Sequence, residues 1–267
     1  MPAYLELKPF EDTSNVGITV SRDDGRNGSF VVRKSLENSE VLGPDVRRLR
    51  ETASNAAAVA SAQIADRSAE GWKKEFPATI RPLATPWQQL QGAAVNRMRE
   101  LDTRRADLLA NRPAIPLNAS EGEKLRLTFG HEVRAAQTVN WLADKKPSDL
   151  LAAALGNREL GSLILSNPSL REKLPGDLAE RLETDVMEQA LTGQVAANFK
   201  VKPSYEAPLG DGPDITAASA AARQAMAAFD ASRNEIAGVE MVLKSAVDFV
   251  AILGDISRAE AFGMLNG

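Results

Sequence analysis

Cysteine is absent from the chain, and histidine occurs only once, as His131. Without a thiol the chain cannot form disulfides, thiolate nucleophiles, zinc ribbons or iron–sulfur clusters. A single imidazole also excludes metal sites that are built from several histidines. We therefore assign no metal ligand and no cofactor-binding residue, and we expect the chain to work without a cofactor.

Long apolar runs are also missing. The best candidate, 236–253, is interrupted by Glu240, Lys244 and Asp248, so we predict no membrane span. The first ten residues lack the basic and apolar regions of a signal peptide, which favours a cytoplasmic chain made without export. The formal net charge of −4 is too small for a general binder of polyanions.

Strand character is confined to residues 1–44. Two short β-rich runs, 16–20 and 29–33, flank the turn-rich segment 22–28. Valine, isoleucine and phenylalanine favour strands, whereas Asp-Gly and Asn-Gly favour tight turns. We predict a small β-hairpin or extended arm that packs on another surface, because a lone hairpin is marginally stable in water.

Helical periodicity begins after Pro44. An alanine-rich stripe over 46–63 predicts a first helix, and Pro77 and Pro82 predict a break after it. Thr85-Pro86 then has the pattern of a cap and first residue of a second helix. A capping box at Ser120 and Glu123 opens a third, whose inward-facing side chains we expect to be Leu125, Phe129, Val133, Ala136 and Leu142.

The remaining chain predicts short helices over 147–195, a linker over 196–215 rich in proline and glycine, and a long helix from 216 that ends at Gly254. A second capping box, Ser257 with Glu260, opens a last short helix. The predicted fold is mainly α, a helical bundle with a long C-terminal helix and a small N-terminal β-hairpin. The predicted domains are 1–44, 45–195, 196–215 and 216–267.

The long helix carries the clearest signal, an apolar stripe with alternating spacings of three and four residues. Such a stripe must be covered, either inside a bundle of the chain itself or by another chain. Its irregular mixture of alanine, serine and phenylalanine favours the bundle over a regular zipper. The candidate interaction residues on this stripe are Phe229, Ile236, Val239, Leu243, Val250 and Leu253.

No pattern predicts catalysis. His131 and Glu132 are adjacent, so on a helix they point about 100° apart and do not form a pair. The acidic segments 23–25 and 211–214 lack the spacing of a calcium loop and are typical of turns. Arginines over 47–50 and 97–112 are interleaved with acidic residues, which favours a solvated, ion-paired surface over a nucleic-acid interface. We therefore predict no enzyme and no catalytic residue.

Four segments, 130–134, 150–155, 163–168 and 178–182, carry a resemblance to a protein family. Together they resemble uncharacterised helical proteins encoded among the virion genes of tailed bacteriophages, which have a Glu-Val/Ile-Arg helix followed by short Leu/Ala-rich helices. The resemblance covers about 60 residues and carries no residue with an assigned role. It implies a head, neck or internal ejected protein.

The functional hypothesis is a non-catalytic structural or interaction protein that contacts other protein subunits in a tailed-phage virion. Its location would be the virion if the chain is phage-encoded, and the cytoplasm otherwise. The alternative is a cytoplasmic adaptor or nucleic-acid-associated helical protein, with the arginine-bearing helices as its contact surface. Nucleic acid is the less favoured partner.

Overall fold

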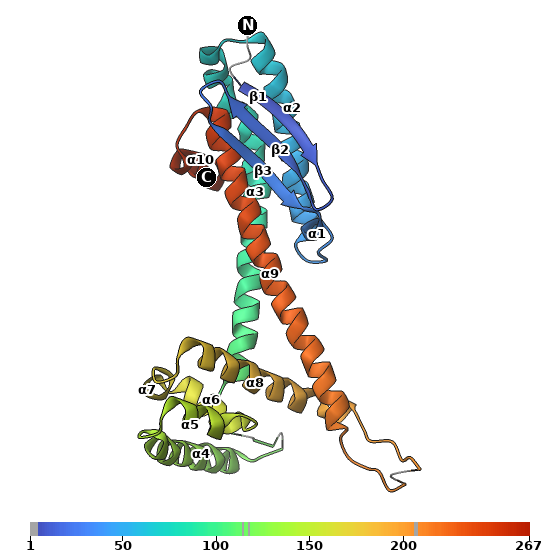
Figure 1. Ribbon diagram of the computed structural model, residues 1–267, viewed down its shortest axis with the longest axis vertical. Coiled ribbons are helices and arrows are strands. Elements are labelled where there is room, and N and C mark those ends of the chain that lie inside the picture. Colours follow the sequence, from blue (N-terminus) through green and yellow to red (C-terminus); the bar gives the residue numbers. More distant parts are fainter. Residues whose placement is uncertain (1–4, 114, 117, 206–207) are drawn as a thin grey trace. The chain divides into compact units, whose positions relative to one another are not determined.

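Helices account for most of the computed structural model, which describes residues 5–113, 115–116, 118–205 and 208–267 (Figure 1). The four N-terminal residues of the predicted arm and two linker residues, 206 and 207, lie outside the described residues. In the described part, the elements are β1 (Leu5–Glu11), β2 (Asn15–Arg22), β3 (Asn27–Arg33), α1 (Lys34–Glu37), α2 (Gly43–Asp66), α3 (Ala69–Leu109), α4 (Glu121–Leu142), α5 (Pro147–Ala154), α6 (Arg158–Ser166), α7 (Pro168–Arg171), α8 (Gly176–Val195), a 3₁₀ turn (Ala196–Asn198), α9 (Ile215–Gly254) and α10 (Arg258–Asn266).

These elements confirm the predicted fold class: a mainly helical chain with a long C-terminal helix and a small N-terminal antiparallel sheet. The chain forms two compact units. The first joins Met1–Glu100 to Ala231–Gly267, and the second comprises Leu101–Asp230. The domain boundaries predicted after 44, 195 and 215 stay predictions, since compact units and folding domains need not coincide.

The sheet of the first unit has three strands in the order β1-β2-β3, all antiparallel. The predicted hairpin is β2 and β3, and β1 adds an edge strand that the sequence did not suggest because it contains Pro9. A proline is tolerated at an edge, where one side of the strand has no ladder to complete. Alternate side chains of the hairpin are buried, among them Ile18, Val20, Phe30 and Val32.

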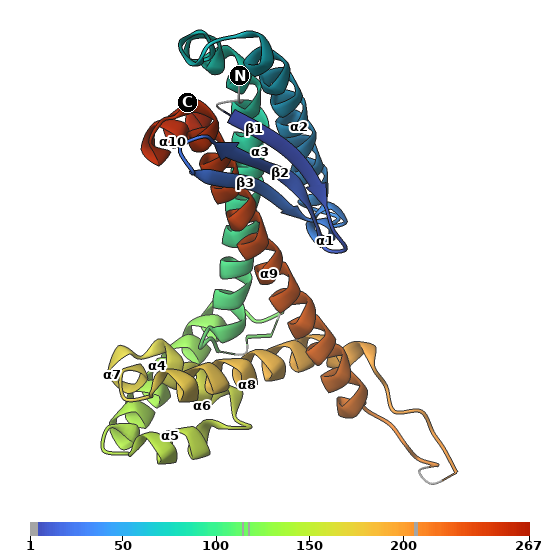
Figure 2. The same cartoon turned by 45° about the horizontal axis from the view of Figure 1, so that its top comes forward.

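The inner face of the sheet packs on α2 and on the C-terminal part of α9 (Figure 2). The rings of Phe30 and Phe249 lie 6.4 Å apart between centroids. The predicted alanine stripe of α2 is buried in the same core, as are Trp72, Phe76 and Ile80 of α3. The first unit is therefore one hydrophobic core built from both ends of the chain.

The predicted break near Pro77 and Pro82 is wrong, since α3 is continuous from Ala69 to Leu109 with Pro77, Pro82 and Pro86 inside it. A proline inside a helix removes one backbone hydrogen bond. Pro77 and Pro82 lie on the exposed side, where water can solvate the freed carbonyl groups. On the opposite side Phe76, Ile80, Leu83 and Trp87 keep helical spacing and are buried, so packing holds the helix together.

An ionic cluster joins the turn between β2 and β3 to the end of α9. Asp255, at a φ of 56°, accepts a hydrogen bond from Arg26 at 2.6 Å and lies 3.5 Å from both Arg22 and Lys73. The hydrogen bond from Arg26 is the main cause that lowers the pKa of Asp255 below its ordinary value. Asp24 of the same turn also binds Arg26, and this hydrogen bond lowers the pKa of Asp24 to about 2.

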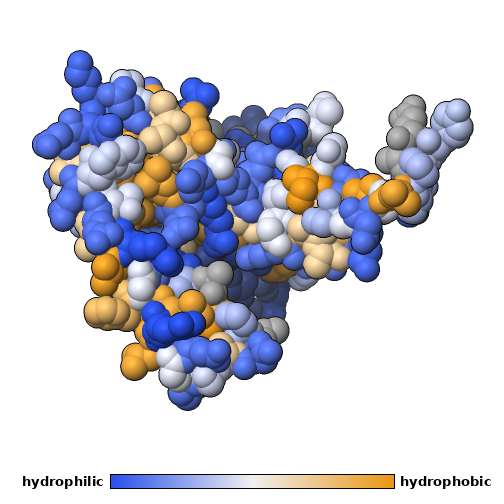
Figure 3. Space-filling view, turned by 90° about the horizontal axis from the view of Figure 1, so that it is seen from below, coloured by the Kyte–Doolittle hydropathy of each residue, from blue (hydrophilic) through white to orange (hydrophobic). Residues whose placement is uncertain are grey.

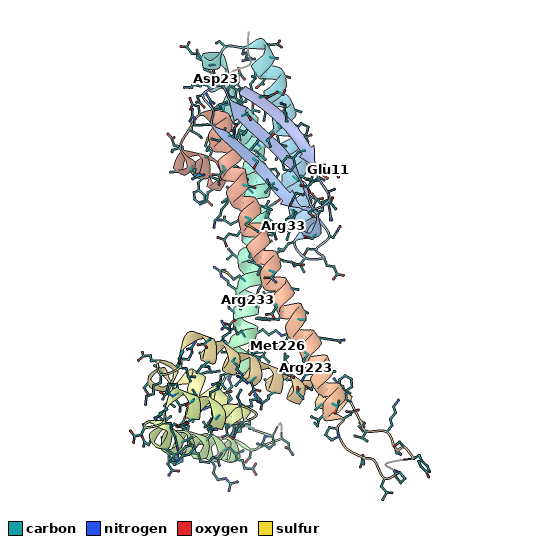
Figure 4. The ribbon with its side chains drawn as sticks, viewed as in Figure 1. Glu11, Asp23, Arg33, Arg223, Met226 and Arg233 are labelled. Atoms are coloured by element: carbon teal, nitrogen blue, oxygen red, sulfur yellow. The ribbon has the colours of Figure 1, made fainter. Side chains whose placement is uncertain are left out.

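We expect this cluster to make the free energy of unfolding depend on pH in the acidic range. A carboxylate whose pKa is lowered by folding contributes stability above its ordinary pKa and loses it as the pH falls through the folded value. Asp255→Asn should therefore reduce the loss of stability measured by urea unfolding between about pH 5 and pH 2. Asparagine also tolerates a positive φ, so the backbone is preserved. Asp23 lies in the same turn (Figure 4) and makes no ion pair among the described residues, so Asp23→Asn is the matched control; an equal change in both variants would contradict the role of Asp255.

The second unit has its own core, formed mainly by α5, α6, α7 and α8. The predicted capping boxes at Ser120–Glu123 and Ser257–Glu260 are both present, the first opening α4 in this unit and the second opening α10 in the first unit. The long helix begins at Ile215, one residue earlier than predicted, because Asp214 caps it by accepting a hydrogen bond from the Ala217 amide at 3.0 Å. Arg223 of α9, labelled in Figure 4, pairs with Glu188 of α8 at 2.8 Å.

Candidate functional site

The predicted interaction stripe on α9 is covered by the chain itself. Val239, Val250 and Leu253 have no exposed surface, and Ile236 and Leu243 pack against the same core of the first unit. Phe229 belongs to the second unit and is also buried. The bundle alternative thus accounts for this stripe, and its association with another chain stays a prediction.

Two buried tryptophans fix α3 to α9 inside this core. The indole Nε1–H of Trp72 donates to the carbonyl of Leu253 at 2.9 Å, and that of Trp87 donates to the carbonyl of Leu243 at 3.2 Å. Buried indole groups require such acceptors because an unpaired N–H in a core is unfavourable. The stripe is therefore held by directed bonds as well as by apolar contact.

An unexpected apolar surface lies on α4. Leu125, Phe129 and Val133, which we expected to face inward, are 75%, 67% and 41% exposed, and Ala136 is exposed as well. Helical geometry places these four side chains on one side together with Gly122 and Asn140. We call this set, Gly122, Leu125, Phe129, Val133, Ala136 and Asn140, the α4 outer face.

The opposite side of α4 packs instead. Leu142, whose inward orientation is confirmed, and His131 are buried there, and Val139 packs against the core of the second unit. The sequence contains two candidate faces on this helix, and the more apolar one is not the one that the neighbouring helices cover. The space-filling view shows apolar side chains at the surface among hydrophilic ones (Figure 3). The exposed side chains of the α4 outer face are available to another molecule.

His131 of α4 is buried. It is 7% exposed, and its Nε2 has no hydrogen-bond partner among the described residues. Its Nδ1 lies 3.7 Å from Glu159 Oε1 of α6, which is beyond hydrogen-bond distance. Ser162, also on α6, is 1% exposed, and its hydroxyl likewise has no partner in the described structure.

Two adjoining cavities of about 340 and 320 Å³ open beside these groups, and both are lined by Asn111, His131, Arg134 and Glu159. We call them together the α4–α6 pocket. The first cavity is completed by Ala135, Thr138, Trp141, Asn157, Leu160 and Leu163, and the second by Ala110, Arg112, Pro113, Leu127, Arg158 and Ser162.

The pocket has more positive than negative side chains. Arg112, Arg134 and Arg158 line it, against the single carboxylate of Glu159. Arg112 pairs with Asp107 at 3.1 Å, whereas Arg134 and Arg158 have no ion-pair partner among the described residues. The arrangement offers hydrogen-bond donors and positive charge, which suits the binding of an anion.

The sequence did not indicate this pocket, because it is formed by groups far apart in the chain. Of its lining residues, the sequence singles out only His131, beside Glu132, and Arg112, among the arginines over 97–112; Glu132 is exposed and does not line either cavity. No spacing rule connects α4 with Glu159 and Ser162, since their distance depends on how α6 packs. The isolated histidine was the one available signal.

The acidic turns and most of the arginines over 47–50 and 97–112 bind other groups of the chain. In the acidic turns, Asp24 binds Arg26 and Asp211 accepts from the Gly212 amide at 2.7 Å, as expected of turn residues. Most of the arginines considered for nucleic acid are occupied: Arg47 and Arg50 bind Glu37, Arg48 binds Gln89, Arg97 binds Glu100, Arg105 binds Glu183 and Arg112 binds Asp107.

No group of three or more His, Asp or Glu side chains in the described ranges is arranged to hold a metal ion. Within the same ranges, every helix is too short or too polar to cross a membrane. No protein-family model, curated protein or solved structure matches the chain.

Proposed function

We propose that the chain is a non-catalytic structural subunit that associates with further copies of itself through the α4 outer face. The observation that supports this is the exposure of Leu125, Phe129 and Val133 along one side of a well-capped helix. Scattered exposed apolar residues are ordinary, but a contiguous apolar row on a helix is the surface that helix pairing buries. Pairing with another protein surface would remove this row from water.

The charges beside the row favour a second copy as the occupant. Glu121 and Glu132 lie on one flank of the α4 outer face, and Arg126 lies on the other. When two copies of a helix lie parallel, the acidic flank of one faces the basic flank of the other, as at the flanking positions of parallel coiled coils. The same face is therefore complementary to itself in a two-fold, parallel pair.

A tailed-phage virion is the setting that we propose for this association. The four segments that carry the resemblance, 130–134, 150–155, 163–168 and 178–182, all belong to the second unit, which also presents the α4 outer face. The resemblance and the proposed contact surface thus coincide in one compact unit. Mass spectrometry of purified particles of the producing phage should find this chain, and its absence would refute the virion assignment without affecting self-association.

Phe129→Asp should abolish the association of the purified chain. Each copy would lose the burial of a phenylalanine and would place a carboxylate in an interface that excludes water. In a two-fold pair the substitution is present in both copies, so the effect counts twice. We expect the dissociation constant measured by sedimentation equilibrium to rise by about 100-fold or more. Val59→Asp on α2 replaces a residue that is 48% exposed in the other unit and is the matched control. A monomeric wild-type chain at high concentration, or unchanged association of Phe129→Asp, would contradict the proposal.

A further inference from the structure

We propose that the α4–α6 pocket binds the phosphate group of a small phosphorylated molecule. The first argument is charge. Three guanidinium groups line the pocket against one carboxylate, and those of Arg134 and Arg158 have no ion-pair partner among the described residues. Guanidinium groups match phosphate oxygens with paired hydrogen bonds, so two unpaired arginines at one cavity favour a doubly charged oxyanion.

The second argument is the pair of buried polar groups without partners. His131 Nε2 and the Ser162 hydroxyl are both inaccessible to water and lack a hydrogen bond within the described residues. Polar atoms at such depth almost always have a partner, so the two unpaired groups on the pocket wall require an explanation. Both residues line the second cavity, so an oxyanion bound there would offer acceptors to both once their side chains turn toward it, because the imidazole and the hydroxyl can each donate a hydrogen bond.

The third argument is the start of α6. This helix has nine residues, and Asn157, Arg158 and Glu159 at its N-terminus all line the pocket. The Asn157 side chain accepts from the Leu160 amide at 3.1 Å, whereas the Arg158 and Glu159 amides have no acceptor in the described structure. Free amide groups and the helix dipole both favour an anion at this end.

The size of the pocket indicates that the phosphate carries an organic group. Each of the two cavities is itself in the range of about 300–1,000 Å³ that is usual for small-molecule sites, and both are much larger than a phosphate ion. Part of the wall of the first cavity is apolar, with Leu160, Leu163 and the ring of Trp141. A planar or apolar group attached to the phosphate could contact this wall, as the base of a nucleotide would.

Isothermal titration of the full chain tests the assignment. We expect saturable binding of inorganic phosphate and of adenosine monophosphate, and no binding of adenosine or of acetate at the same concentration. Tighter binding of adenosine monophosphate than of inorganic phosphate would support the apolar wall as part of the site. Equal affinity would limit the site to the phosphate group, whereas failure of both phosphates to bind, or equal binding of acetate, would overturn the proposal.

Variants assign the binding to the pocket. Arg134→Gln and Arg158→Gln should each weaken phosphate binding about tenfold or more, because each removes a charged hydrogen-bond donor. Glu159→Gln should strengthen it, since the variant removes the only negative charge on the wall. Arg104→Gln is the matched control: Arg104 is exposed in the same unit and does not line the pocket. All four residues are exposed, so the variants should fold, which thermal melting can verify.

This proposal does not depend on self-association. The pocket residues of α4 and the α4 outer face occupy different sides of the helix, so Phe129→Asp should bind phosphate as the wild-type chain does. Weakening by Glu159→Gln, or equal effects of Arg104→Gln and Arg134→Gln, would show that the binding is not to this pocket.

Discussion

Val250→Asp is expected to unfold the first unit at room temperature. Val250 has no exposed surface and lies in the core shared by the sheet, α2, α3 and α9. An unpaired carboxylate in such a place costs on the order of 5 kcal/mol even after the protein relaxes. That is comparable to the whole free energy of unfolding of an ordinary domain, about 5–15 kcal/mol.

Tryptophan fluorescence reports this change directly. Trp72 and Trp87 are each 2% exposed in the first unit, whereas Trp141 of the second unit is 58% exposed, so a red shift of the emission follows exposure of the first two. Met241→Asp is the matched control on the same helix. Met241 is 47% exposed, so the carboxylate of the introduced aspartate would stay in water. A wild-type urea midpoint for Val250→Asp would show that this core is not packed as described.

Gly161→Val is expected to destabilise the second unit by about 1–3 kcal/mol, the usual cost of overfilling a core. A Cβ at position 161 would come within 2.4 Å of Val186 Cγ2 and 3.3 Å of Leu182 Cδ1. Val186 and Leu182 are fully buried, so neither can move aside without displacing its neighbours. The glycine therefore sets the close approach of α6 to α8, the arrangement that also places Glu159 and Ser162 at the pocket.

A compensating change distinguishes crowding from a loss of helix propensity. Val186→Ala removes the atom that the new side chain would strike, so the double variant should be more stable than the sum of the two single effects predicts. Gly130→Ala on α4 is the control, because a Cβ there has nothing within 4 Å and should be stabilising. Amide hydrogen exchange of α6 and α8 gives the local free energies; strict additivity of the two substitutions would refute the steric explanation.

Local signals predicted the helices and their ends well. The capping boxes at Ser120 and Ser257 and the stop at Gly254 depend on residues within one turn, and all three are present. The stripe of α9 was equally clear because its period persists for ten turns or so. Where local preference and packing agree, the sequence is sufficient.

The errors arose where packing overrode local preference. The prolines of α3 oppose a helix locally, but the buried side chains around them enforce one. On α4, periodicity identified the more apolar side, and nothing in the sequence showed that α6 would cover the side with His131 instead. The pocket was unpredictable for the same reason: it brings Arg134 and Glu159 together only after α4 and α6 have packed.

Single-cysteine cross-linking tests the central claim, that two copies meet in parallel along the α4 outer face. Because the chain has no cysteine, Phe129→Cys or Ala136→Cys introduces the only thiol. In a parallel pair each residue faces its own counterpart, so mild oxidation should give a covalent dimer for both variants but not for Val59→Cys, which is exposed in the first unit. A yield of dimer at positions 129 and 136 no higher than at position 59 would contradict the account.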